Sequence, residues 1–134
     1  MTKILLCIVI LCSGCTPGLK SVVFNNTKES VVVEVCSEKH EIDVGASVEI
    51  YNILCEEAPT VKIGNNSFHY ETKFINYPIE VKYDEYIDKK IGKRVIKYQI
   101  NEDGTILIVP VKNSFPYVEN IKQPAGFPLA PKNS

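Results

Sequence analysis

The stretch TVKIGNNSFHYETKF, residues 60–74, decides the fold class. Its apolar residues alternate with polar ones at a period of two, which is typical of a β-strand with one buried face. Gly64-Asn65-Asn66 interrupts the alternation, and Gly and Asn tolerate the positive φ angles of tight turns. We therefore expect a β-hairpin whose arms are residues 60–63 and 67–74.

The same period of two continues on both sides of this hairpin. It predicts further strands over residues 29–36, 47–55, 78–87, 94–101 and 105–112. Residues 84–91 also fit a helical spacing, but we expect a strand followed by a loop there. Short strands without long crossovers favour an all-β fold, an antiparallel β-sandwich of about seven strands with immunoglobulin-like topology. A small β-barrel is the alternative.

Length and charge limit the class of protein. The chain has 134 residues, 45% of them hydrophobic, which suits one domain with one core. Its 15 Lys and Arg residues nearly balance 16 Asp and Glu residues, for a net charge of −1. A chain without a basic excess has no field for phosphate backbones, so we expect no nucleic-acid partner.

The N-terminus has the pattern of a secretory signal peptide over residues 1–14. Lys3 precedes an unbroken apolar run from Ile4 to Leu11, and the small residues Ser13 and Gly14 follow. The apolar run is much shorter than the roughly 20 residues needed to span a bilayer. We therefore exclude this segment from the folded domain.

The stretch LCSGC, residues 11–15, resembles the lipobox of bacterial lipoproteins. The resemblance implies that Cys15 receives diacylglycerol and becomes the anchored N-terminus after cleavage, although the family prefers Leu where this chain has Cys12. Thr16 stands where retention in the inner membrane would use Asp, which implies the outer membrane, facing the periplasm. Ordinary signal-peptidase cleavage near Gly14 is the alternative.

Two cysteines, Cys36 and Cys55, remain after the leader and the anchor are set aside. An even number of remaining cysteines in an exported chain predicts a disulfide, because the periplasm is oxidising. The bridge would close a loop of about 20 residues. Cys36 and Cys55 do not have the C-x-x-C spacing, so we expect neither a redox pair nor a metal site there.

The mature chain divides into a lipidated tether over residues 15–18, the sandwich over residues 19–113 and a tail over residues 114–134. The tail is rich in proline and shows no periodicity, which predicts an extended segment that is either disordered or lies over the sandwich. It also carries four large apolar side chains that a solvated tail would not need, Phe115, Tyr117, Phe127 and Leu129. We interpret them as possible partner contacts, and a frayed terminus is the alternative.

Catalytic motifs are missing from the sequence. The two histidines have no ligand spacing: His40 falls in an expected polar loop over residues 37–41, and His69 on the outward face of an expected strand. No motif for nucleophilic catalysis or phosphate binding occurs. We therefore expect no catalytic residue, no metal and no cofactor. A glycan-active enzyme using the acids of 56–57 and 84–88 is an alternative.

One short segment concentrates basic residues, namely Lys89, Lys90, Lys93 and Arg94. It could face lipid head groups or a polyanionic glycan, or be an ordinary solvated surface. Together these features predict a non-catalytic binding module, lipid-anchored at the outer membrane, which holds another envelope protein. An inhibitor or immunity protein is the sharper version and would use a loop at 37–44 or 56–59. A structural accessory of an envelope or secretion machine is the alternative.

Overall fold

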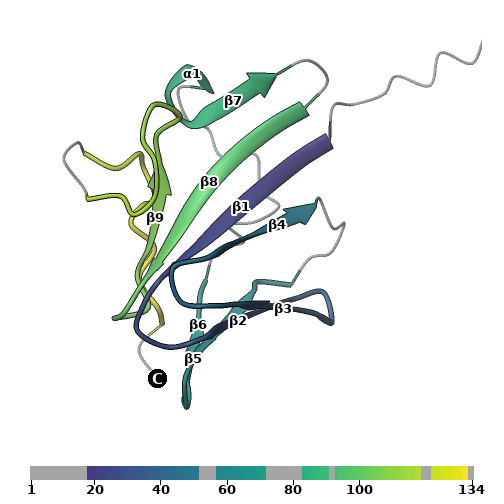
Figure 1. Cartoon of the computed structure of the whole chain (residues 1–134), viewed down its shortest axis with the longest axis vertical. Helices are drawn as coiled ribbons and strands as arrows, with labels where there is room; N and C mark the ends of the chain where they lie inside the picture. The colour runs from purple at the N-terminus through teal and green to yellow at the C-terminus, as the bar shows by residue number, and fades with distance from the viewer. Residues whose placement is uncertain (1–17, 52–56, 72–82, 91–92, 119–121, 133–134) are drawn as a thin grey trace, which may run out of the picture.

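A computed structural model describes residues 18–51, 57–71, 83–90, 93–118 and 122–132. Within these ranges the chain forms strands and one helical turn (Figure 1). The elements are β1 (Gly18–Asn26), β2 (Val31–Val35), β3 (Glu38–Ile42), β4 (Ser47–Tyr51), β5 (Thr60–Ile63), β6 (Asn66–His69), α1 (Tyr83–Tyr86), β7 (Ile87–Lys90), β8 (Lys93–Asn101) and β9 (Ile106–Val109).

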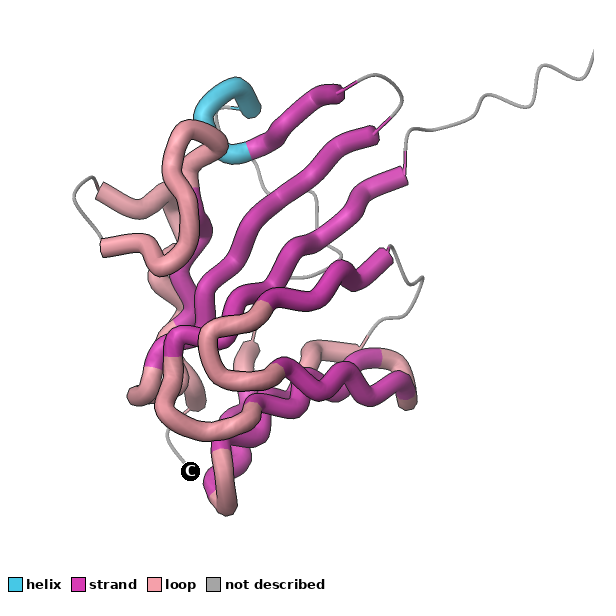
Figure 2. The backbone as a smooth tube through the Cα atoms, viewed as in Figure 1, coloured by secondary structure: helices cyan, strands magenta, loops and turns pink. Residues whose placement is uncertain are grey.

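The strands form two sheets packed against each other (Figure 2). The first sheet has the order β4-β1-β8-β7, and β9 also pairs with β8; the second has the order β3-β2-β5-β6. The predicted β-sandwich is confirmed. The described strands do not close into a barrel, because each sheet keeps its own strand order. These ranges hold nine strands where about seven were expected.

Strand β8 organises the first sheet. Its first half pairs with β7 and its second half with β9, both antiparallel. Its other edge pairs with β1 in parallel, from Gly18 opposite Lys93 to Asn26 opposite Asn101. The sheet is therefore mixed rather than purely antiparallel. A parallel pair needs a long connection between its strands, and β1 and β8 have one because they are far apart along the chain.

The second sheet confirms the hairpin at residues 60–69 and corrects the expected loop over residues 37–44. The hairpin pairs β5 with β6, with Ile63 opposite Asn66. Residues 38–42 form β3 instead of a loop, and pair with β2. The turn between them has positive φ at Cys36 (52°) and Ser37 (65°), as a two-residue hairpin turn requires. Cys and Ser are unusual at such positions, so this turn could not be recognised from its residues.

The strand expected over residues 78–87 is wrong at residues 83–86, which form the single turn α1. Tyr86 and Ile87 are both buried, so the period of two breaks where the turn meets β7. Residues 72–82 lie outside the described ranges. In the described part of the chain, no helix has the length and hydropathy needed to cross a membrane.

The main core lies between the two sheets. Its members alternate along the strands, as expected, and are almost fully buried: Val23, Val31, Val33, Val61, Ile96, Tyr98, Ile100, Ile106 and Ile108. Burial raises the pKa of the Tyr98 phenol far above its ordinary value, because the phenolate would lose its hydration. The sandwich is therefore a rigid frame for the loops at its ends.

The first part of the tail packs on the outer face of the first sheet, whereas Phe127 and Leu129 pack with the main core. On that outer face Tyr117 and Phe115 form a second, smaller core with Leu107 and Val109 of β9. Farther along, Leu129 forms an isolated bridge with Ile106. The structure thus has an ordered tail in its described part, covering one end of the sheet.

Two buried glutamine side chains fix the tail. Gln99 of β8 donates to the carbonyl of Tyr117 at 2.9 Å and accepts from its N–H at 2.7 Å. Gln123 makes the mirror arrangement, since it donates to the carbonyl of Ile108 at 3.0 Å and accepts from its N–H at 2.9 Å. Each amide replaces a strand neighbour, so backbone groups that the tail covers stay hydrogen-bonded.

Candidate binding site at the loop end of the sandwich

A buried asparagine builds the end of the sandwich where β1 finishes. Asn25 is fully buried, and its amide donates to the carbonyls of Glu29 at 2.8 Å and Ile42 at 2.9 Å. Its side-chain oxygen accepts from the N–H of Thr27 at 2.9 Å. One side chain therefore joins the end of β1, the turn into β2 and the end of β3.

A second turn is tied to the same asparagine through its backbone. The N–H of Asn25 donates to the carbonyl of Ala46 at 3.0 Å, and the N–H of Gly45 donates to the carbonyl of Asn25 at 3.1 Å. Gly45 has a φ of +70°, which glycine adopts without strain. The turn leaves Val44 more than half exposed, at 55%. An apolar side chain thus projects from a hydrogen-bonded loop.

Two stacked phenylalanines form an apolar wall beside these turns. Phe24 of β1 is buried, and its ring lies 4.6 Å from that of Phe115 with an interplanar angle of 9°. Such an offset or stacked aromatic pair contributes about 1 kcal/mol beyond its buried area. Phe115 belongs to the tail, so the tail supplies part of this end of the molecule.

Lys97 holds the segment that leads to Phe115. Its ammonium donates to the carbonyls of Val111, at 3.3 Å, and Asn113, and lies 5.8 Å from the Phe115 ring centroid. Burial lowers the pKa of Lys97, because the charged amine loses water there. The carbonyls replace part of that lost hydration, so this lysine acts as a structural donor.

Polar groups surround the wall. The Asn26 amide donates to the Asn101 side-chain oxygen at 3.0 Å, and the Lys28 N–H donates to a Glu102 carboxylate oxygen at 3.0 Å. Lys28 and Glu102 are both exposed. No ion pair engages the Lys28 ammonium among the described residues. The Lys28 and Glu102 side chains therefore bring charges of both signs to the solvent-exposed rim of this end.

These elements enclose an open hollow of about 490 Å³, which we call the loop-end hollow. Its lining comes from residues 24–28, 44–45, 102 and 115–116. The volume is within the usual range for ligand sites, and it would admit one or two large side chains of a partner. Apolar walls with a polar rim are the usual anatomy of a protein contact whose centre is an apolar anchor.

The four tail side chains that were predicted as possible partner contacts pack against other residues of this chain. Tyr117 and Leu129 are buried, Phe115 stacks on Phe24, and the Phe127 ring lies 6.0 Å from that of Tyr98. Their apolar surface explains how the tail is held, and their contact with a partner stays a prediction. Of the four, Phe115 also lines the loop-end hollow.

The predicted covalent sites are only partly within the described residues. Cys36, in the turn after β2, is disulfide-bonded. Cys55 and Cys15 lie outside the described ranges. The Cys36–Cys55 pairing and the acylation of Cys15 therefore stay predictions.

The histidines and acids of the described residues form at most pairs, such as His40 and Glu38, whose Nε2 and carboxylate oxygen lie 3.5 Å apart. His40 is in β3 and His69 is exposed in β6, where an outward position was expected. Glu57 and Glu85 are exposed, and Glu56 lies outside the described residues. Within the described ranges, no group of three or more His, Cys, Asp or Glu side chains could hold a metal ion.

Sequence reasoning missed the loop-end hollow, although a signal was present. Asn25 and Thr27 stand two positions apart at the end of an apolar run, a spacing that favours a turn closed by the Asn side chain. Nothing in the sequence indicated that the tail would bring Phe115 to the same place. Comparison with protein-family models, with curated proteins and with solved structures finds no match.

Proposed function

We propose that this protein is a non-catalytic binding module of the bacterial envelope, anchored to the outer membrane by acyl chains on Cys15, and that the loop-end hollow holds a second envelope protein. The observation that carries the proposal is the hollow itself. Its apolar wall is formed by Phe24 of β1 and Phe115 of the tail, and the exposed Val44 stands on a turn that is hydrogen-bonded to the backbone of the buried Asn25. A preformed apolar site on rigid loops loses little entropy when a partner binds.

The position of the hollow supports the same function. Strand β1 begins at Gly18, three residues after Cys15, and ends at Asn26, which lines the hollow. Nine residues of strand separate these ends by about 26 Å. An anchor at Cys15 would therefore leave the hollow well away from the membrane, where another protein can reach it.

Site-specific photo-cross-linking in intact cells tests this proposal. A photo-reactive residue at Val44, on the rim of the hollow, is expected to give one defined protein adduct. The matched control is Tyr51, at the far end of β4, which is similarly exposed at 62% against 55%. Equal adducts from both positions, or none from Val44, would contradict a partner site at the hollow.

A charge-reversal variant tests whether Lys28 takes part in binding the partner. Lys28→Glu places a second carboxylate beside Glu102, whose side chain accepts from the Lys28 N–H. We expect the Val44 adduct to fall at least fivefold without a change in melting temperature, because the ammonium has no ion pair to lose. An unchanged yield of the Val44 adduct would show that Lys28 does not contribute to binding of the partner.

The identity of the adduct separates the versions of the proposal. A hydrolase or a toxin would indicate an inhibitor or immunity protein. A subunit of a secretion or envelope machine would indicate a structural accessory.

A further inference from the structure

Three large apolar side chains of the described residues are exposed, and they belong to different parts of the molecule. Val44 lines the loop-end hollow, and Val118 belongs to the tail. Tyr51, which is 62% exposed, is the last residue of β4. The β1–β4 pairing sets it opposite Lys20, two residues after β1 begins at Gly18. Tyr51 therefore lies close to the point where the predicted tether joins the domain.

Tyr51 belongs to a small patch on the outer face of the first sheet. Its neighbours there follow from the register, because residues directly opposite each other point to the same face. Val22 lies opposite Glu49 of β4, and Val95 of β8 lies opposite Lys20. Both valines are half-buried. We call these five residues the tether-side patch, which combines apolar surface with one cation and one carboxylate.

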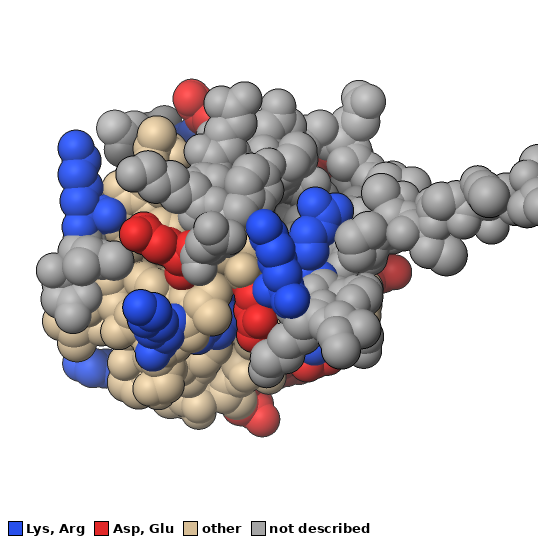
Figure 3. Space-filling model, turned by 90° about the horizontal axis from the view of Figure 1, so that it is seen from above, with Lys and Arg blue, Asp and Glu red and all other residues tan. Residues whose placement is uncertain are grey.

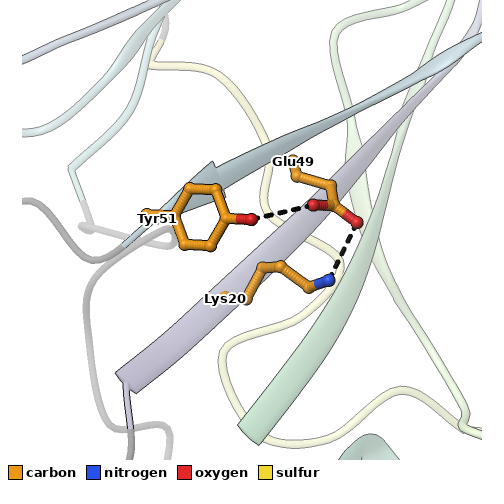
Figure 4. Close-up of polar contacts among 3 residues, drawn as sticks. All are labelled: Lys20, Glu49 and Tyr51. Carbon is orange, nitrogen blue, oxygen red and sulfur yellow. Dashed lines mark hydrogen bonds and ion pairs between the residues drawn. The ribbon is translucent and has the colours of Figure 1, made fainter. Parts of the chain in front are cut away.

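The ring of Tyr51 is held in place by its neighbours. Its hydroxyl donates to one Glu49 carboxylate oxygen at 3.1 Å, and the Lys20 ammonium lies 2.8 Å from the other oxygen (Figure 4). The hydrogen bond with Glu49 raises the pKa of Lys20, so the pair stays charged. A side chain that is already oriented loses little entropy when it makes a contact. The exposed ring is thus preorganised for binding.

Charges of both signs occur at this end of the molecule. The basic segment noted in the sequence lies here, because Lys90 of β7 is opposite Lys93 of β8, which is opposite Gly18. Lys89 and Arg94 have interaction partners within the chain. Figure 3 looks down on the end where β7 and the start of β8 lie, and shows Asp and Glu side chains among the Lys and Arg side chains. A contact made by this end therefore depends mainly on its apolar groups.

We propose that the tether-side patch contacts the lipid interface of the membrane that holds Cys15, with the Tyr51 ring among the head groups. This inference rests on the proposed anchoring. The three residues from Cys15 to Gly18 reach at most about 10 Å. Tyr51 is one strand spacing, about 5 Å, from Lys20. Tyrosine is enriched at membrane–water interfaces, because its ring is apolar while its hydroxyl stays hydrated.

This contact gives the anchored module an orientation. Acyl chains at Cys15 fix the position of one residue, whereas a second contact at Tyr51 also fixes the direction of the sheet. Strand β1 runs from the tether-side patch to the loop-end hollow, about 26 Å farther on. The hollow is then held on the side of the domain that faces away from the membrane.

Tryptophan fluorescence tests the contact, since the chain contains no tryptophan of its own. The acylated full chain carrying Tyr51→Trp is purified from bacterial membranes. It is then reconstituted into phosphatidylcholine vesicles with or without brominated acyl chains, which quench a nearby tryptophan. We expect the brominated lipid to reduce the emission to roughly half.

Val44→Trp is the matched control, because Val44 is similarly exposed (55% against 62%) but lies at the loop-end hollow. We expect no quenching of this variant by the brominated lipid. Equal quenching of the two variants would overturn the oriented contact.

Lipid charge distinguishes an aromatic contact from an electrostatic one. The Tyr51→Trp measurement is repeated with vesicles that contain roughly one third phosphatidylglycerol. Because Lys20 and Glu49 match each other, we expect the same quenching as with neutral lipid. Quenching that appears only with the anionic lipid would show attraction by cations and overturn the role of the ring.

Flotation of the same vesicles separates this inference from the anchoring. A chain that floats with the vesicles while Tyr51→Trp shows no quenching would overturn the patch contact alone. A chain that stays in solution would contradict the proposed anchoring, and the contact with it.

A protein on the tether-side patch is the alternative outcome. The photo-reactive residue at Tyr51 that serves as a control for the hollow also tests this alternative in intact cells. We expect it to form adducts with lipid. A defined protein adduct from Tyr51 would overturn the assignment of this patch to the membrane.

Discussion

The side-chain amide of Gln99 pairs with both backbone groups of Tyr117, at 2.7 and 2.9 Å, as a neighbouring strand would. Gln99 is 1% exposed, and its side chain lies on the outer face of the sheet, under the tail. Two residues before Tyr117, Phe115 stacks on Phe24 and lines the loop-end hollow. The same amide therefore sets both the tail and the wall of the candidate site.

Gln99→Leu is predicted to loosen that wall. Removing the amide leaves the N–H and carbonyl of Tyr117 without their partner, which costs about 2–4 kcal/mol of unfolding free energy. Urea denaturation measures this cost, and cross-linking from Val44 should fall as well. Gln123→Leu is the control, because it breaks an equivalent pair at Ile108. Equal effects of both variants on cross-linking would contradict a positioning role for Gln99.

Gly104→Ala is predicted to destabilise the fold through a steric clash. A Cβ there would lie 2.5 Å from the Phe68 ring, and φ is +79°. Gly126→Ala is a matched control, since its φ is +87° and nothing lies within 4 Å of the added atom. We expect Gly104→Ala to cost about 1–3 kcal/mol more than Gly126→Ala in urea denaturation. Similar costs for the two would contradict the packing of Phe68 on this turn.

The fold is expected to lose stability in alkali through its buried tyrosines. Burial raises the pKa of Tyr70 and Tyr98 above their ordinary value of 10.0. A folded-state pKa above the unfolded value gives stability that is complete below about pH 10 and is lost as the pH rises toward the raised pKa. Urea denaturation between about pH 8 and 12 measures the loss.

Tyr70→Phe measures the contribution of Tyr70 to this alkaline loss of stability separately from that of Tyr98. The Tyr70 hydroxyl donates to the carbonyl of Gly104 at 2.6 Å, so its removal costs about 1–2 kcal/mol near neutral pH. The same variant should weaken the alkaline loss, because one buried phenol no longer ionises. A loss as steep as in the unmodified chain would show that Tyr70 does not contribute.

The disulfide is predicted to join Cys36 to Cys55. Closing a loop of about 20 residues contributes on the order of 3 kcal/mol by restricting the unfolded chain. Reduction, or Cys36→Ser, should therefore lower the melting temperature by several degrees. Peptide mapping of the unreduced protein identifies the partner, and a linked peptide that contains any other cysteine would contradict the pairing.

Local patterns predicted the local parts of the fold. The β5–β6 hairpin and the buried valines of β2 follow from alternation and turn residues that lie within a few positions of each other. The parallel β1–β8 pairing could not be predicted in this way, because it depends on hydrogen bonds between segments some 75 residues apart. The same holds for the charged β3, whose polar residues resemble a loop although the strand lies at a sheet edge.

The candidate site could not be predicted from the sequence for a related reason. In an alternating strand Gln99 has the position of a solvent-facing residue, and it is buried because the tail covers that face. The apolar residues of the tail were recognised, but a sequence does not say whether they pack on their own sheet or on a partner. Phe115 thus lines the hollow because of tertiary packing, which no local sequence motif indicated.

Mass spectrometry of the N-terminal peptide, taken from the membrane fraction of cells that make this protein, tests the account most directly. We expect the chain to begin at Cys15 and to carry a diacylglyceryl group. An unmodified peptide that retains Met1 would contradict the anchored module and the orientation proposed from it.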